Sequence, residues 1–168
     1  TFDGNGHKIS NIYISNGNRQ NGLFSINYGL IKNLHVDTIS ITSSYSSSQA
    51  TLLLHGAGGI TGINTGDIIN CAVYDLSVSG YSISNDWQTL GCGGIAGING
   101  GNINNCIVSD FSNIGTSVKL TDVGGIAGIN GKDASNTNVN ALISQTIVFD
   151  SILSTSSSLG RSGGIVGV

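Results

Sequence analysis

One motif recurs along most of this sequence, and it constrains the fold more than any other feature. Its clearest copy spans residues 93–108, where Asn99 lies 35 residues after Asn64 and 31 residues before Asn130. Asn64 in turn lies 37 residues after Asn27, which lies 22 residues after Asn5. Self-similarity at a period of about 20–50 residues is typical of solenoids and arrays. The sequence therefore predicts a stack of repeats.

The same alignment places four further positions of each copy in columns. These columns are Ile9, Ile31, Ile68, Ile103 and Ile143; Asn11, Asn33, Asn70, Asn105 and Gln145; Ile12, Leu34, Cys71, Cys106 and Thr146; and Ile14, Val36, Val73, Val108 and Val148. A helical repeat is excluded, because residues 93–108 contain five Gly and four Asn, which are poor helix formers. The apolar positions instead indicate short β-strands separated by bends. We predict an all-β, right-handed parallel β-helix (β-solenoid) of about five coils of 22–40 residues, with Ile9, Ile12 and Ile14 heading the inward columns.

Two columns of asparagine are expected at the bends. Asn is one of the few residues that readily adopt a left-handed backbone conformation, and stacked side-chain amides can hydrogen-bond from coil to coil as in cross-β structures. We expect such ladders to fix the register of the coils; the alternative is that Asn only fills turns. The first ladder comprises Asn5, Asn27, Asn64, Asn99 and Asn130, and the second Asn11, Asn33, Asn70 and Asn105.

The Gly-Gly-Ile-x-Gly-Ile segments have two interpretations, a phosphate-binding loop or a close approach of backbones. A phosphate loop opens a helix and usually carries a Lys, and neither feature follows residues 93–98. We therefore interpret these glycines as sites of close backbone approach.

Residues 93–108, with a second copy at 123–130, resemble the GLUG repeat of bacterial and protist surface proteins, whose consensus runs Gly-Gly-Leu-Val-Gly-x-Asn-x-Gly-x-Ile-x-Asn-Cys. The opening Phe-Asp-Gly-Asn-Gly-His-Lys-Ile of residues 2–9 similarly resembles the first coil of pectate-lyase-like β-helices. GLUG repeats occur in adhesins, fibrous surface proteins and non-catalytic regions of secreted metallopeptidases. The resemblance implies an extracellular or cell-surface location and an elongated shape.

We interpret residues 1–168 as a single β-solenoid segment, a window of a longer array with uncapped ends. Charged residues make up only 9% of the chain and the six Lys and Arg are scattered, which argues against nucleic-acid binding. No apolar run approaches the roughly 18 residues of a membrane span. The expected partners are other protein chains or further copies, through lateral or end-to-end packing, and surface glycans are a further candidate.

Cys71 and Cys106 share a column, so they are expected about one strand spacing apart, within disulfide reach. Because that column also holds Ile12 and Leu34, buried free thiols are the first interpretation. A disulfide or a metal site are the alternatives. Cys92 has no partner in the columns.

Asp75, Asp110 and Asp150 each follow the valine column by two residues, so their carboxylates are expected to stack. Carboxylates about 5 Å apart repel one another, and such a stack needs turn N–H donors or a cation. Capping of turns is the first interpretation, and a Ca²⁺ site is the alternative. No other cofactor is indicated.

The columns do not assemble a catalytic group set. His7, His35 and His55 fall in three different contexts and are expected at the surface. None has a nucleophile and an orienting group within predicted reach. We therefore expect a protein that is not an enzyme.

Alternation along the strands sends the residues between the inward columns outward. The resulting row is Tyr13, His35, Ala72, Ile107 and Ile147, with Tyr74 and Phe149 one step further on. Exposed apolar surface of this kind usually marks a contact. We expect the apolar part of it to meet another chain or a second copy, or to be covered by the loop at 132–142; this part comprises Tyr74, Ile107, Ile147 and Phe149.

Two classes of function fit these observations. The first is a non-catalytic structural or adhesive solenoid of a cell-surface or extracellular fibrous protein, which makes protein–protein or cell-surface contacts. The alternative is a carbohydrate-binding or carbohydrate-active β-helix, for which Tyr81, Asp86 and Trp87 are the compact candidates for glycan contact.

Overall fold

The computed structural model describes residues 1–16, 19–45, 54–79, 82–83, 89–114, 120–151 and 160–167. These residues form twenty β-strands and no helix, so this part of the chain is all-β as predicted. The strands belong to four sheets, within which every pairing is parallel.

Each sheet collects short strands from distant parts of the chain. Sheet 1 contains β1 (Phe2–Asp3), β5 (Leu30–Lys32), β9 (Asp67–Ile69), β14 (Asn102–Asn104) and β18 (Leu142–Ser144). Sheet 2 contains β2 (Lys8–Asn16), β6 (His35–Tyr45), β10 (Ala72–Ser79), β11 (Ser82–Ile83), β15 (Ile107–Ile114) and β19 (Ile147–Phe149). Sheet 3 contains β3 (Gln20–Asn21), β7 (Leu54–Gly58), β12 (Thr89–Gly93), β16 (Leu120–Gly124) and β20 (Arg161–Gly163). Sheet 4 contains β4 (Phe24–Asn27), β8 (Thr61–Asn64), β13 (Ala96–Asn99) and β17 (Ala127–Asn130).

The chain visits the four sheets in the order 1, 2, 3, 4 and then returns to sheet 1, so neighbouring strands come from successive turns. This topology is a parallel β-solenoid, which confirms the predicted fold class. About three turns separate the first and last strands of the four-stranded sheet 4. Sheets 1 and 3 each contain five strands and sheet 4 contains four, so the described strands form between four and five coils, slightly fewer than the five expected.

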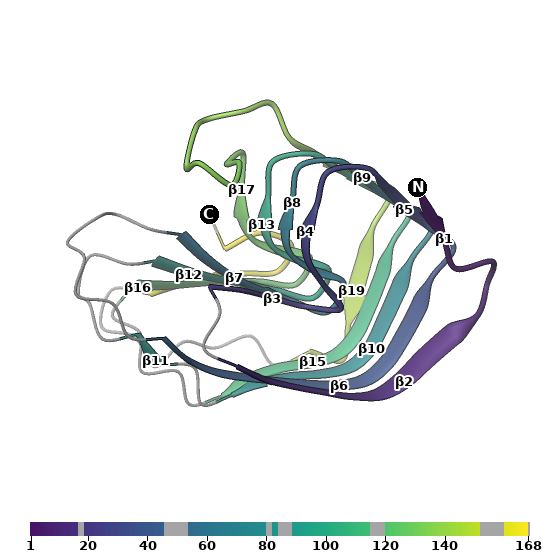
Figure 1. Ribbon diagram of the computed structural model, residues 1–168, viewed down its shortest axis with the longest axis horizontal. Helices are drawn as coiled ribbons and strands as arrows, with labels where there is room; N and C mark the ends of the chain where they lie inside the picture. The colour runs from purple at the N-terminus through teal and green to yellow at the C-terminus, as the bar shows by residue number, and fades with distance from the viewer. Residues whose placement is uncertain are drawn as a thin grey trace.

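Two apolar clusters fill the solenoid. The larger one lies inside sheets 1, 2 and 3 and includes Ile68, Val73, Leu76, Leu90 and Ile95. The smaller one lies between sheets 3 and 4, where Ile63, Ile98 and Ile129 pack with Ile26 and Leu54. Sheet 3 accordingly lies between sheet 2, along the lower edge of Figure 1, and sheet 4 above it.

Glycine allows sheets 3 and 4 to lie this close. A Cβ atom added at Gly97 would lie 2.5 Å from the Cα of Gly56, and one at Gly56 would collide with the carbonyl of Gly62. A side chain at either position would therefore push the two sheets apart. This contact explains the last glycine of the recurrent Gly-Gly-Ile-x-Gly-Ile segments and agrees with the predicted close backbone approach.

From the second turn onward the strand register matches the predicted columns. Ile68 pairs with Ile31 and Ile103, and Val73 pairs with Val36 and Val108. The last turn stays in register through Ile143 and Val148, despite the long insertion that follows Asn130. The valine and isoleucine columns face the larger cluster, as predicted.

The register of β2, in the first turn, differs from the prediction by five residues. The isoleucines expected to head columns pair as Ile9 with Val36, Ile12 with Ile39 and Ile14 with Ile41. The cause is that Asn5 and Asn11 are six residues apart, as are Asn27 and Asn33, although the two pairs have different roles. Asn5 and Asn11 are bend residues with φ of 51° and 58°. All three isoleucines still pack against the larger cluster, so their inward direction was predicted correctly.

One asparagine ladder is buried and the other is exposed. In the inner ladder, Asn27, Asn64, Asn99 and Asn130, each side-chain amide donates to Oδ1 of the next over 2.7 to 2.8 Å. In the outer ladder, Asn33, Asn70 and Asn105, the amides donate in the opposite direction, over 2.7 and 3.3 Å. Only the outer ladder has positive φ.

Asn5 and Asn11 belong to neither ladder, contrary to the prediction. The amide of Asn33 instead donates to Oδ1 of Asp3 over 3.0 Å, so a carboxylate ends the outer ladder. The prediction treated all asparagines as one kind of position. Two kinds exist, because an inner-ladder Asn bridges turns from a buried site, whereas an outer-ladder Asn also sets a left-handed bend.

Candidate functional site

A column of bend residues crosses the solvent-facing side of sheet 2. Its members all have left-handed backbone angles: Asn11, Thr38, Asp75, Asp110 and Asp150, with φ between 48° and 58°. The three aspartates therefore stack as predicted, at exposed positions. Thr38 stands out, because a β-branched residue adopts this conformation only at a cost of order 1–3 kcal/mol. Such strain is often found at functional sites.

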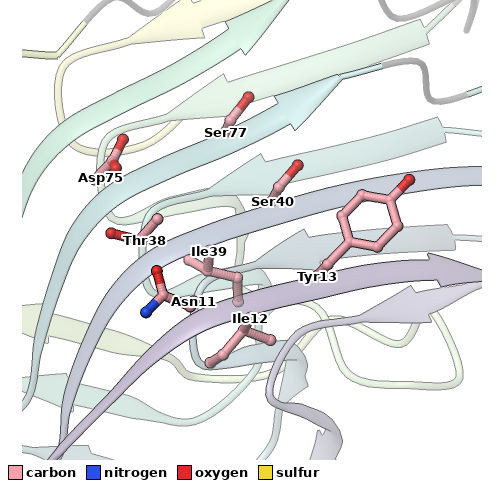
Figure 2. Close-up of a pocket in the computed structure, with 8 residues that line it drawn as sticks. All are labelled: Asn11, Ile12, Tyr13, Thr38, Ile39, Ser40, Asp75 and Ser77. Carbon is pink, nitrogen blue, oxygen red and sulfur yellow. The ribbon is translucent and has the colours of Figure 1, made fainter.

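A groove of about 330 Å³ lies along this column, and we call it the outer groove. Figure 2 shows Asn11, Thr38 and Asp75 in one line across three strands, with a second line of hydroxyls beside it. The second line consists of Tyr13, Ser40 and Ser77. The floor of the groove consists of Ile12 and Ile39. The register explains both lines, since Tyr13 pairs with Ser40 on β6 and Ser40 pairs with Ser77 on β10.

Tyr13 is an exposed residue of the outer groove, with 68% of its surface accessible. Its hydroxyl lies 3.4 Å from Oγ1 of Thr42. The pKa of the Tyr13 phenol is lowered mainly by the hydrogen bond with Thr42 and to a smaller extent by one with Ser15. An aromatic face beside amide, hydroxyl and carboxylate groups can bind a polyhydroxylated molecule by stacking and hydrogen bonding. Sequence reasoning missed this groove, because it placed Tyr13 in the wrong row.

The apolar residues predicted to form an interaction face lie together on sheet 2. We call Tyr74, Ile107, Ile147 and Phe149 the outer patch. Ile107 pairs with Ile147 across β15 and β19, and Phe149 lies one step further along β19. Ile147 is 58% exposed and Phe149 is 45% exposed, whereas Tyr74 and Ile107 are half-buried. Tyr13 lies outside this row and Lys8 takes its place next to His35.

The long insertion does not cover the outer patch, so that alternative was wrong. It folds beside sheets 1 and 4. There the backbone N–H of Val139 donates to the carbonyl of Gly131, and the backbone N–H of Leu142 donates to the carbonyl of Gly101. The green segment at the top of Figure 1 shows this placement. Ile147 remains mostly exposed as a result.

The three histidines do not come together. His7 and His35 are exposed as expected, but His55 is fully buried. His55 pairs with Leu90 and that residue with Thr121, so this position of sheet 3 faces inward. The alignment of the Gly-Gly segments already places His55 opposite Leu90, and this was the signal that could have corrected the expectation.

All three cysteines carry buried free thiols, which agrees with the first interpretation. The pKa of Cys71 is lowered mainly by a side-chain hydrogen bond with Cys106. The same hydrogen bond is the main cause that raises the pKa of Cys106, and burial is the second cause. Burial is the main cause that raises the pKa of the Cys92 thiol, and the negative charge of Asp122 is the second cause. Within the described ranges, no three His, Cys, Asp or Glu side chains lie close enough to hold a metal ion.

The residues predicted for glycan contact, Tyr81, Asp86 and Trp87, lie outside the described residues. Across the part of the chain that the structure describes, no helix is long and apolar enough to span a membrane. No family model matches the chain, and neither a curated protein nor a solved structure matches it.

Proposed function

We propose that this chain is a non-catalytic structural and adhesive β-solenoid, of the GLUG-repeat kind, in a cell-surface or extracellular fibrous protein. Its partner is another protein surface, which contacts the outer patch. The observation that carries the proposal is the exposure of Ile147 and Phe149 side by side on a regular sheet.

The solenoid suits this role because it holds the patch rigidly. Tyr74, Ile107 and Phe149 lie on strands that pair in register, above valines of the buried column. Strand pairing already orders the backbone of these residues, which reduces the conformational entropy lost when a partner binds. A few residues contribute most of the binding energy at protein interfaces, and Tyr, which the patch contains, is one of the residue types enriched among them.

A pair of substitutions tests the proposal. Ile147→Ser with Phe149→Ser should abolish most adhesion of the purified chain to cells or to extracellular matrix proteins, and most of its lateral self-association. Leu142→Ser is the matched control, since Leu142 is 57% exposed on sheet 1, away from the patch. Sedimentation velocity and adhesion to coated surfaces give the two readouts. Equal adhesion of all three proteins would contradict the proposal.

A second candidate function is carbohydrate binding, and the outer groove favours it. Tyr13 offers an aromatic face, while Thr38, Ser40 and Asp75 offer hydrogen-bonding groups around it. Binding to a glycan array should fall at least tenfold in Tyr13→Ala and be unchanged in Tyr28→Ala, because Tyr28 is 74% exposed outside the groove. Glycan binding that survives Tyr13→Ala would remove the groove from consideration.

A further inference from the structure

A second and smaller pocket lies between sheets 3 and 4, at the edge of the smaller apolar cluster. It has a volume of about 180 Å³. Leu54 and Ile129 form its apolar wall, and Asp122, Arg161 and Lys132 supply its charged groups. Neither the outer groove nor the outer patch shares a residue with it.

Asp122 orients the first cation of this pocket. Its side chain is 2% exposed, and both of its oxygens accept from Arg161, with Nε–Oδ1 at 2.7 Å and Nη2–Oδ2 at 2.9 Å. The two residues are register partners on β16 and β20. A guanidinium has five N–H donors, so this fork leaves three for another acceptor. The Arg161 side chain is 56% exposed, which keeps those donors accessible.

The insertion of the last turn supplies the second cation. Oδ1 of Asp133 accepts from the backbone N–H of Ser135 at 2.9 Å and of Thr137 at 2.8 Å, which closes a tight turn. Lys132 precedes this turn, and its Nζ donates to the carbonyl of Asn136 over 3.4 Å, at the long end of the hydrogen-bond range. Within the described ranges, Lys132 has no carboxylate at ion-pair distance.

The pocket therefore holds two cations and one buried carboxylate that Arg161 already neutralises. This local excess of positive charge occurs in a chain with a formal net charge of −3. Its ligand should thus carry a negative charge and also cover Leu54 and Ile129. A carboxylate on a short aliphatic stem meets both requirements. Inorganic phosphate meets only the first, because it would leave the apolar wall uncovered.

We propose that this pocket is a carboxylate-binding site, in which the free N–H groups of Arg161 and the Lys132 ammonium bind the anion and Leu54 and Ile129 contact its aliphatic stem. The carboxylate comes from a free short-chain acid or from a glutamate side chain of a partner. In this proposal the insertion after Asn130 contributes Lys132 to the same pocket as Arg161, which lies 29 residues later in the chain (161 − 132 = 29).

Titration of the purified chain with butyrate, followed by NMR of the Arg161 side-chain Nε–Hε signal, tests this proposal. We expect a saturable shift in the millimolar range, and a similar shift with a glutamate-containing peptide if the site takes a side chain. Butyrate alone producing the shift would assign the site to free acids. Butanol, which has the same stem without the charge, should produce no saturable shift.

Variants identify the residues that bind. Lys132→Gln should weaken butyrate binding about tenfold, whereas Lys132→Arg should retain most of it. Lys32→Gln is the control for loss of one positive charge, because Lys32 pairs with Asp3 on sheet 1. The amide spectrum of each variant reports whether it is folded. Equal affinity of wild type and Lys132→Gln, or equal binding of butanol, would overturn the proposal.

Discussion

Asn64 donates its side-chain amide to Oδ1 of Asn99 on the neighbouring turn over 2.8 Å, and neither residue is accessible to solvent. Asn99 repeats this contact with Asn130 over 2.7 Å and also donates to the carbonyl of Gly101 over 3.0 Å. A single amide thus satisfies buried groups on its own turn and on both neighbours. Buried polar groups need such partners, so the ladder fixes the register of three turns.

Asn99→Ala should therefore lower the free energy of unfolding by about 2–3 kcal/mol, because it leaves buried groups on both neighbouring turns without a partner. Asn102→Ala is the control, since Asn102 is exposed and donates to Oδ1 of Asp67 at the surface. Asn102→Ala should lower the free energy of unfolding by no more than about 1 kcal/mol. Urea unfolding followed by circular dichroism measures both. Equal costs would mean that burial of the ladder contributes nothing.

Gly94→Ala should destabilise the protein by about 3 kcal/mol or more. A Cβ atom there would lie 2.5 Å from Cγ1 of Val108 and closer still to the carbonyl of Gly125, so the neighbouring turns must move apart. Gly164→Ala is the matched control, because no atom lies within 4 Å of a Cβ atom at that position. Thermal unfolding should show a lower midpoint for the first variant and an unchanged one for the second.

The strand register could be predicted from the sequence for those turns in which each column holds a characteristic residue type. Val73 and Val108 are fully buried and pair with each other, and each turn has a branched apolar residue at this position, so their alignment is unambiguous. The first turn was misaligned because Asn is suited to two positions, a buried bridge at Asn27 and a left-handed bend at Asn5. Residue type alone does not separate these roles.

The pockets were harder to predict than the fold. Arg161 and Asp122 are paired although they lie 39 residues apart, and neither belongs to a repeated column. Tyr13 reaches the outer groove only through its pairing with Ser40, which depends on the register of the first turn. Sites of this kind are built from positions where the repeats differ, and a consensus does not report those positions.

Thr38→Asn should stabilise the protein by about 0.5–1 kcal/mol. Thr38 has φ of 54°, and Asn occupies this left-handed conformation at lower cost than a β-branched residue. Thr42→Asn is the control, because Thr42 lies in β6 without a positive φ. Urea unfolding measures both variants. If Thr38 also binds a glycan in the outer groove, the same variant should bind more weakly while being more stable.

Two carboxylates hold the first turn to the second. Oδ1 of Asp3 accepts from the backbone N–H of Asn5 over 2.9 Å, and Oδ2 pairs with Lys32 at 3.2 Å. Asp37 on β6 pairs with Lys8 on β2 at 2.9 Å. The hydrogen bond from Asn5 is the main cause that lowers the pKa of Asp3, and the hydrogen bond from Lys8 is the main cause for Asp37.

Acid should therefore loosen the first turn before the rest of the solenoid. Because both pKa values are lower in the folded state than the ordinary 3.8, the two carboxylates stabilise the fold above about pH 3.8 and lose this effect as the pH falls through their folded values. Amide hydrogen exchange of β1 and β2, relative to β10 and β15, should accelerate as the pH falls below about 3.8. Asp3→Asn with Asp37→Asn should remove most of this extra pH dependence, because an amide does not titrate there. A doubly substituted chain whose first turn still loosens selectively in acid would show that other groups are responsible.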